Sequence, residues 1–367
     1  MEKRNLYILF LFIIPLLFVS CSDNNPIGID YSSPWITSSP EAQNVDSNYL
    51  NSLVSQINNN VFGYIQGVIV VRNNKLIFEK YFHGYSRETL HRVYSVTKSF
   101  SSAMIGIAIQ QGIISAINEK LLNYYKNYSI KDLDTLKLSI TLRDALTMSA
   151  GFQWNELSIP YSDPNNDFNR LFSSTDAVKF VLDKTIQDYP GTKFRYSTGL
   201  PLLFSYIIQK ETGESAETYA IENIFNKIGI KNYAWNDAPG GITNTGSGLS
   251  LRPIDMALFG QLYLNHGYWN NQQIISADWI NLSTAAAISI NSNLEYGFYW
   301  WRYSDSNPVV NTLPSNDIYF ALGYGDQIIW IIPQYKMVVV VTADNGENYF
   351  QTDNILKDYI LPSITNK

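Results

Sequence analysis

Ser95 and Lys98 form the only Ser-x-x-Lys sequence in this chain of 367 residues. They precede a segment from Ser99 to Gln111 in which small and apolar residues recur at helical spacing. Residues three apart share one face of a helix, so the Lys98 amine can approach the Ser95 hydroxyl. Burial would lower the pKa of that amine and allow it to take the serine proton. The pair predicts a Ser95 nucleophile activated by Lys98.

Ser-x-x-Lys is nevertheless a short pattern, and a solvated turn of a surface helix is the alternative interpretation. Other catalytic patterns are absent from the sequence. The three histidines, His83, His91 and His266, form no metal-binding motif, and His91 is predicted to be structural. There is no Gly-x-Ser-x-Gly turn and no glycine-rich nucleotide loop. We therefore expect neither a metal nor an organic cofactor.

Further segments favour the catalytic interpretation of the Ser-x-x-Lys pattern over the surface-helix alternative. They are Val93 to Phe100 around the pair, Ile140 to Gly151 with its Met-Ser-Ala-Gly, Pro190 to Gly199, and Pro253 to Tyr268. Together they resemble the class C β-lactamase-related serine hydrolase family, over about residues 63–342. Within it they are most similar to the branch that contains 6-aminohexanoate-oligomer hydrolases and esterases. The resemblance implies an α/β fold of the β-lactamase/transpeptidase type.

This resemblance also implies a proton-relay tyrosine, and Tyr196 matches its position in the Pro-Gly-x-x-Phe-x-Tyr-Ser segment. A phenol beside a lysine could exchange protons with it. The alternative is a core aromatic residue, since the chain has 26 tyrosines. Thr198 stands where β-lactamases have an asparagine, which puts a contact with a substrate amide in doubt.

The third segment that the family uses, Lys-Thr-Gly, is missing from this chain. Gly323-Tyr324-Gly325-Asp326 stands in its place, before the strand-like Gln327 to Ile332. Glycines let backbone approach a substrate closely, and we expect a backbone N–H of Asp326 or Gln327 to be the oxyanion donor beside that of Ser95. A plain tight turn is the alternative. Without the lysine, efficient β-lactamase action is less expected than ester or amide hydrolysis.

Three functions stay open at this point. The first is a serine hydrolase that cleaves a small ester, amide or peptide through an acyl-enzyme on Ser95, with Lys98 and Tyr196 as acid and base. The second is a penicillin-binding D-Ala-D-Ala peptidase or weak β-lactamase. The third is a non-catalytic envelope lipoprotein that uses the fold for binding. Trp154, Trp300 and Trp301 could line a cleft, but tryptophans of this kind are more often core residues.

The N-terminus is typical of a bacterial export signal. Lys3 and Arg4 precede an apolar stretch from Leu6 to Val19 that is shorter than a membrane-spanning helix. Cys21, the only cysteine, follows directly in a segment that resembles a lipobox. We expect residues 1–20 to be a signal peptide and Cys21 to carry a lipid anchor in the cell envelope, on the periplasmic or surface side. A plain signal peptide is the alternative.

The elements that must position these residues follow from the sequence periodicity. A flexible tether is predicted for residues 21–45 and a hydrolase domain for 46–367. The sheet-forming parts are about residues 60–95 and 290–367, and helical patterns occupy about 98–290. Within the first part, the alternating segment from Tyr64 to Phe82, with Asn73-Asn74 between its halves, predicts a β-hairpin. In the last part, a helix is expected from about Asn348 to Tyr359. This order predicts a mixed α/β fold, with an antiparallel sheet flanked by helices and an inserted, mostly helical lobe. The net charge of −6 makes nucleic acid an unexpected partner.

Overall fold

The alternating segment after residue 64 forms the predicted hairpin, in which β2 (Ile65–Arg72) pairs with antiparallel β3 (Lys75–Tyr81). Asn73 and Asn74 make its turn with φ of 52° and 62°, the left-handed conformation that a two-residue type I′ turn requires. The computed structural model describes residues 35–348 and 351–365. The predicted signal peptide and Cys21 lie outside the described residues.

The hairpin belongs to a sheet that, within the described residues, has nine strands. β16 (Met337–Ala343) lies beside β2, so the sheet joins the two ends of the described chain. All its strand pairs are antiparallel except β1 with β3. In spatial order the strands are β1 (Ile36–Thr37), β3, β2, β16, β15 (Gln327–Ile332), β14 (Tyr319–Gly323), β13 (Trp301–Tyr303), β12 (Leu294–Tyr296) and β11 (Ile288–Ser289).

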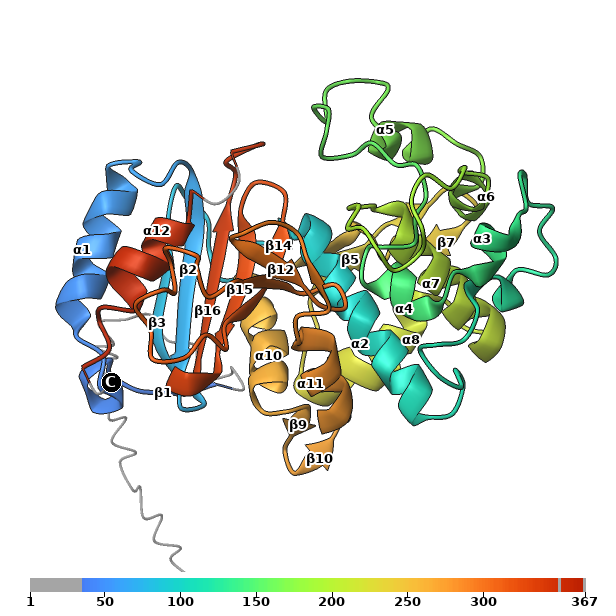
Figure 1. The fold of residues 1–367 in the computed structure, drawn as a ribbon. Coiled ribbons are helices and arrows are strands. Elements are labelled where there is room, and N and C mark those ends of the chain that lie inside the picture. The colour runs from blue at the N-terminus through green and yellow to red at the C-terminus, as the bar shows by residue number, and fades with distance from the viewer. Residues whose placement is uncertain (1–34, 349–350, 366–367) are drawn as a thin grey trace, which may run out of the picture. The chain divides into compact units, whose positions relative to one another are not determined.

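Helices cover both faces of this sheet. Figure 1 shows α1 (Ser47–Asn58) and α12 (Asp353–Ile355) on one face and α10 (Pro253–Leu264) on the other. Every residue of β16 is buried, as its unbroken apolar run predicts for a strand covered on both faces. Gly260 of α10 allows close packing, because a Cβ there would lie 2.6 Å from a methyl group of Val338.

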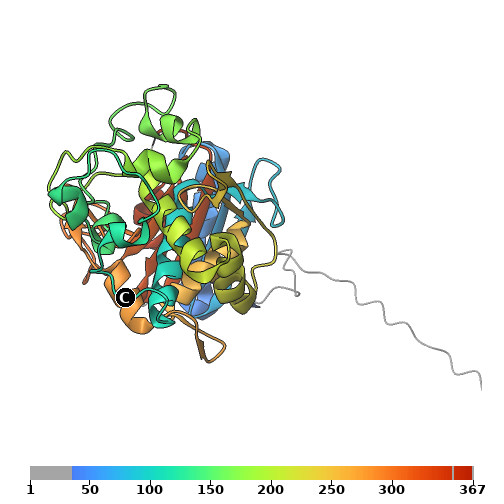
Figure 2. The same cartoon turned by 90° about the vertical axis from the view of Figure 1, so that its right-hand side faces the viewer.

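The remaining helices lie between the two sheet-forming parts of the sequence. In Figure 2 these helices stand in front of the sheet. The longest are α2, which carries Lys98, and α7, which follows Tyr196. The helices are α2 (Thr97–Gln110), α3 (Thr135–Ser139), α4 (Leu142–Leu146), α5 (Asp167–Phe172), α6 (Ala177–Leu182), α7 (Gly199–Thr212), α8 (Ala216–Ala220), α9 (Asn226–Ile228) and α11 (Ala277–Thr284).

Three small sheets accompany these helices. One has the order β4 (His91–Arg92), β8 (Leu249–Leu251) and β5 (Tyr233–Trp235), and it fixes the chain just before Ser95. The others pair β6 (Asp237–Ala238) with β7 (Ile242–Thr243), and β9 (Tyr268–Trp269) with β10 (Gln272–Gln273). His91 is buried and bonded through Nδ1 to Gln66 at 2.8 Å.

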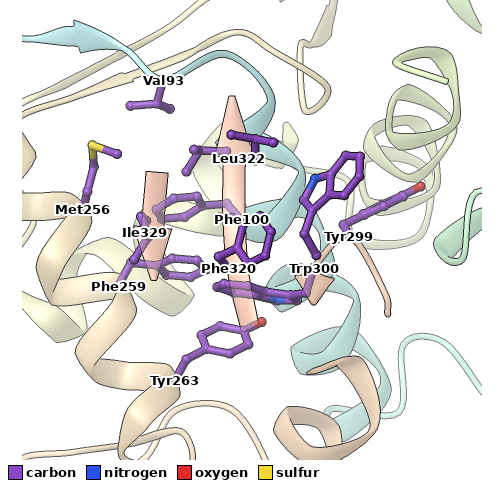
Figure 3. Close-up of a cluster of buried hydrophobic side chains, with 14 of the residues drawn as sticks. Val93, Phe100, Met256, Phe259, Tyr263, Tyr299, Trp300, Phe320, Leu322 and Ile329 are labelled. Carbon is purple, nitrogen blue, oxygen red and sulfur yellow. The ribbon is translucent and has the colours of Figure 1, made fainter. Parts of the chain in front are cut away.

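The core that supports the site lies between α2, α10 and the sheet. Figure 3 shows aromatic side chains from each, with Phe100 of α2 beside Phe259 of α10. Their rings stack with centroids 3.7 Å apart, and Trp300 stacks on the other side of Phe259 at 6.0 Å. These side chains are fully buried. Large interlocking rings leave α2 little freedom to shift, which holds its first turn in place.

Most predicted elements are present, and the mixed α/β fold is confirmed. Two boundaries differ from the expectation. The folded unit begins at Trp35, not at residue 46, because β1 pairs with β3 and Val45 bridges to Ile364. The polar composition of residues 35–45 gave no sign of these contacts. The helix expected from Asn348 to Tyr359 is, among the described residues, limited to α12 and one π-helical turn at 356–360.

Candidate active site

Ser95 lies in a short 3-10 turn, Tyr94–Val96, directly before α2. Tyr94 has φ of 45°, a left-handed conformation that costs a tyrosine on the order of 1–3 kcal/mol. The sharp turn leaves the Ser95 side chain partly exposed while Val96 is fully buried. Backbone N–H groups at the start of a helix remain free to meet a negative charge. The turn therefore presents the Ser95 hydroxyl at the start of a helix.

Lys98 lies one turn later, and its amine is fully enclosed. Its Nζ is 2.7 Å from Ser95 Oγ, 3.0 Å from Thr198 Oγ1 and 2.8 Å from the Gly246 carbonyl oxygen. Only 1% of the side chain is exposed. Burial lowers the pKa of the Lys98 ammonium to about 7, although the negative charge of Glu156 opposes this. Near neutral pH the amine can thus exist uncharged and accept a proton.

Tyr196 lies just before α7, and its ring centroid is 4.8 Å from Lys98 Nζ. The ring is 7% exposed and lies at 5.8 Å from the ring of Trp301 on β13. Tyr196 and Trp301 line a cavity together with Ser95. The structure thus brings Ser95, Lys98 and Tyr196 together from two distant parts of the sequence. Trp154 and Trp300 are buried core residues, as expected. Trp301 is also buried, but it lines the cavity at Ser95.

Glu156 is a buried residue of this site that the sequence interpretation missed. Its Oε1 accepts hydrogen bonds from the hydroxyls of Thr198 at 2.6 Å and Tyr161 at 2.9 Å. Its Oε2 accepts from the Thr198 N–H at 2.7 Å and from the Trp154 indole N–H at 2.8 Å. The available signal was its place in the Trp-Asn-Glu that follows the Met-Ser-Ala-Gly of the resemblance, since an acidic residue that becomes buried needs partners.

The turn that replaces Lys-Thr-Gly lies against the nucleophile. A Cβ on Gly323 would come within 2.3 Å of the Val93 carbonyl oxygen and 3.2 Å of the Ser95 nitrogen, so only glycine fits. Gly323 and Tyr324 line the cavity at Ser95. Gly325, with φ of 72°, and the two residues after it are buried.

Asp326 and Gln327 do not line either cavity at Ser95. The Asp326 carboxylate accepts a hydrogen bond from Asn345 at 3.1 Å. The Gln327 amide donates to the Ala343 carbonyl. Both side chains therefore stabilise the turn through hydrogen bonds to residues 343 and 345. Gly323, whose position lies close to the Ser95 nitrogen, and Tyr324 are the residues of this turn that line the cavity.

Two cavities meet at Ser95, separated by the contact between Tyr161 and Tyr324, whose ring centroids are 5.6 Å apart. The first cavity is largely apolar. Besides Ser95 it is lined by Leu157, Tyr161, Tyr196, Trp301, Leu322, Gly323 and Tyr324. The second, called the polar cavity below because charged and hydroxyl side chains contribute to its wall, is lined by Arg92, Tyr94, Ser95, Glu156, Tyr161, Phe168, Thr198, Ser247 and Tyr324. A substrate with an apolar part and a polar part would fit across the serine.

Arg92 supplies a positive charge in the second cavity. Its guanidinium lies 4.8 Å from the centre of the Tyr94 ring, and the side chain is exposed. The sequence interpretation noted the loss of the Lys-Thr-Gly lysine and assigned no role to Arg92. Among residues 35–348 and 351–365, no group of three or more His, Cys, Asp and Glu side chains is placed to bind a metal ion.

The chain is similar to known proteins in both sequence and fold. The model of the family described as β-lactamase matches residues 59–360. A solved structure titled as a candidate 6-aminohexanoate-dimer hydrolase from Bacillus anthracis has a TM-score of 0.73 at 21% identity. The likeness covers 90% of this chain and 87% of that one. A family VIII carboxylesterase has a TM-score of 0.66 at 13% identity, over 89% of this chain and 98% of that one.

A curated relative from Escherichia coli K12 is named as a candidate D-alanyl-D-alanine carboxypeptidase. It is 20% identical over 402 residues, which cover 90% of this chain and 89% of the relative. At these identities the structural likenesses show a common fold, and the names of the neighbours differ in substrate.

Proposed function

The chain belongs to the β-lactamase family of serine hydrolases, and on that premise we propose that it cleaves an ester or amide bond through an acyl-enzyme on Ser95. Lys98 is the general base and Tyr196 the proton relay. The observation that carries this proposal is the 2.7 Å contact between Lys98 Nζ and Ser95 Oγ, made by an amine that burial brings to a pKa of about 7.

The proposed reaction begins when Ser95 Oγ attacks the substrate carbonyl carbon and its proton passes to the neutral Lys98 amine. The carbonyl oxygen takes up the negative charge, which the N–H groups of Ser95 and Tyr324 stabilise. We choose Tyr324 over Asp326 and Gln327 because Tyr324 lines both cavities at the nucleophile.

In the second half, the proton moves from Lys98 through the Tyr196 hydroxyl to the leaving oxygen or nitrogen, and the bond to the carbonyl carbon breaks. Water then attacks the acyl-enzyme, giving up a proton along the same route, and Ser95 is released. The Tyr196 ring lies 4.8 Å from Lys98 Nζ and lines the cavity at Ser95, which supports the proposed role of Tyr196 as the relay.

A fluorophosphonate probe tests the nucleophile without knowledge of the substrate. The mature protein should be labelled, and Ser95→Ala should abolish labelling. Lys98→Ala should give a folded protein whose labelling rate falls by about 1,000-fold or more, because the serine loses its base. Labelling that persists in Ser95→Ala would refute the assignment, and no labelling of the wild type would favour the non-catalytic alternative.

One observation favours a second candidate function. Arg92 offers a cation to a substrate carboxylate in the polar cavity, and curated relatives are named as candidate D-alanyl-D-alanine carboxypeptidases. A peptidase or penicillin-binding activity would use the same serine. Covalent labelling by a fluorescent penicillin, together with release of D-alanine from a D-Ala-D-Ala peptide, would select this candidate. Turnover of uncharged esters alone would select the first.

We also propose that the protein is an exported lipoprotein of the bacterial envelope, anchored through Cys21. The support is the position of this sole cysteine after the apolar segment. Among the residues that the structure describes, no helix is both long and apolar enough to cross a bilayer. Radiolabelled palmitate should be incorporated by the wild type and not by Cys21→Ser, which should also leave the membrane fraction. Equal incorporation in both would contradict the anchor.

A further inference from the structure

The carboxylate of Glu156 has all its hydrogen-bonding positions filled by protein donors. Ionised carboxylates offer about four lone-pair positions. Thr198 occupies two of them through its N–H and its hydroxyl, and Trp154 and Tyr161 occupy one each. The side chain is 1% exposed, so water does not compete for these positions. Glu156 therefore acts only as an acceptor.

This arrangement fixes the direction of the Thr198 hydroxyl. The hydroxyl has a single proton, and Glu156 Oε1 takes it at 2.6 Å. The Thr198 oxygen, 3.0 Å from Lys98 Nζ, is then left to accept a hydrogen bond from the amine. The Gly246 carbonyl, at 2.8 Å from the same nitrogen, can also only accept. Two of the three contacts of Lys98 thus require N–H donation from the amine.

We propose that Glu156 is a positioning residue, which acts through Thr198 to direct the lone pair of the neutral Lys98 amine at Ser95. A neutral amine has two protons and one lone pair in a tetrahedral arrangement. When both protons go to Thr198 and Gly246, the lone pair takes the remaining direction, toward Ser95 Oγ at 2.7 Å. The inference rests on the proposed function, in which Lys98 receives the Ser95 proton.

Glu156→Gln should reverse the direction in which the Thr198 hydroxyl donates its proton, without changing the shape of the side chain at position 156. The backbone N–H of Thr198 and the indole N–H of Trp154 can only donate, so they require the glutamine oxygen at the Oε2 position. The glutamine NH₂ group then replaces Oε1 and donates to the two hydroxyls. The Thr198 proton must turn toward Lys98, where it occupies the lone pair that Ser95 needs.

The experiment measures the second-order rate at which a fluorophosphonate labels Ser95, between pH 5.5 and 9, in the full-length protein. The variants are Glu156→Gln, Thr198→Val, which removes the hydroxyl, and Thr198→Ser, which keeps it. Glu222→Gln is the matched control, since it makes the same change in net charge at an exposed residue. Thermal unfolding of each variant verifies that it is folded.

We expect Glu156→Gln and Thr198→Val to label at least about 100-fold more slowly than wild type, a loss of the size that a misdirected proton produces. Thr198→Ser should label within about fivefold of wild type, because a hydroxyl is restored.

Lys98 faces two titratable groups, Tyr196 and Glu156, and the negative charge of Glu156 favours the protonated form of Lys98. Glu156→Gln should therefore move the midpoint of the pH profile to lower pH, whereas Glu222→Gln should not.

The possible failures are distinguishable. Absence of labelling in the wild type would overturn the proposed function together with this inference. Normal labelling of the wild type, with Glu156→Gln within fivefold of it and an unchanged midpoint, would overturn the role of Glu156 alone. If Thr198→Ser labels as slowly as Thr198→Val, packing at residue 198 and not the hydroxyl proton controls the labelling rate. This outcome would also overturn the role of Glu156. If Glu156→Gln fails to fold, the two Thr198 variants still decide the matter.

Discussion

At the scale of single residues, the chemistry depends on an amine that is kept from solvent. Lys98 is 1% exposed, and its three polar contacts are the Ser95 hydroxyl, the Thr198 hydroxyl that bonds to Glu156, and the Gly246 carbonyl. None of these contacts is an ion pair. The lowering of the Lys98 pKa by burial is therefore larger than the increase caused by the negative charge of Glu156. A lysine on the surface of the same helix would remain charged and could not serve as a base.

The labelling rate should therefore depend on pH through Lys98. The pKa of its ammonium is lowered to about 7, and only the neutral amine accepts the serine proton. The rate with a fluorophosphonate should rise as pH increases, with a midpoint near that value, and level off above it. Measurement from pH 5 to 9 tests this expectation. A rate that is flat over this range, or that falls as pH rises through 7, would contradict it.

Arg92 is expected to contribute to substrate selection. Its exposed guanidinium in the polar cavity can attract a carboxylate, an interaction that is worth up to about 1 kcal/mol at such a site, or about fivefold in KM. Arg92→Gln should raise KM for a substrate with a carboxylate in its leaving group and leave its uncharged amide analogue unaffected. Lys80→Gln, a distant exposed residue, is the control for net charge. Equal effects on both substrates would contradict the prediction.

At the scale of elements, three separate segments meet at Ser95, the proposed nucleophile. The turn before α2 supplies Ser95, the segment before α7 supplies Tyr196 and Thr198, and the end of β14 supplies Gly323. The stacked rings of Phe100 and Phe259 hold α2 against α10, which packs on the sheet. The spacing between β14 and the Ser95 turn is set by the absence of a side chain at Gly323.

Gly323→Ala should consequently separate β14 from the nucleophile. The new Cβ would lie 2.3 Å from the Val93 carbonyl oxygen, a backbone atom that cannot rotate away. We expect labelling of Ser95 to fall at least about 10-fold and stability to fall by about 1–3 kcal/mol. Gly213→Ala, at the C-terminal end of α7 with φ of 81° and open space around it, is the control. It should cost about 1 kcal/mol of stability and leave the labelling rate unchanged. Similar labelling of both variants would contradict the expectation.

At the scale of the whole molecule, the folded unit is closed by segments from both ends of the sequence. β2 pairs with β16, and α1 and the C-terminal helical turns pack on the same face of the sheet. In this C-terminal part, Asp353 accepts a hydrogen bond from Tyr303 of β13 at 2.7 Å. Burial and the nearby negative charge of Asp326 raise the pKa of Asp353 to about 7, against an ordinary value of 3.8.

Asp353 should make stability depend on pH. Because its pKa is higher in the folded state, the folded protein binds more protons than the unfolded chain between about pH 4 and 7, and stability should fall as pH rises through this window. Asp353→Asn should remove that part of the slope and be about 1–4 kcal/mol more stable than wild type at pH 8. Urea unfolding at several pH values measures this difference, with the exposed Asp358→Asn as control. Parallel slopes for wild type and Asp353→Asn would contradict it.

Much of this protein follows from local sequence rules. The hairpin turn at Asn73 and Asn74, the helix that starts after Ser95 and the apolar run of β16 each depend on neighbouring residues, so the sequence predicts them directly. The Ser-x-x-Lys spacing likewise placed the Lys98 amine near the Ser95 hydroxyl, because three residues make almost one helical turn. The family, too, was recognisable from short segments.

Tertiary structure alone decided the rest, because the remaining contacts join residues far apart in the sequence. Glu156 gains its role only where Trp154, Tyr161 and Thr198 all donate to it, and no local pattern records the contact with Thr198 across 42 residues. The turn at the end of β14 is positioned by the fit of Gly323 against Val93, and Tyr324 of this turn lines the cavity at Ser95. The spacing of Ser95 and Lys98 can be read from the sequence, whereas the burial of Lys98, on which the proposed reactivity depends, is a property of the fold.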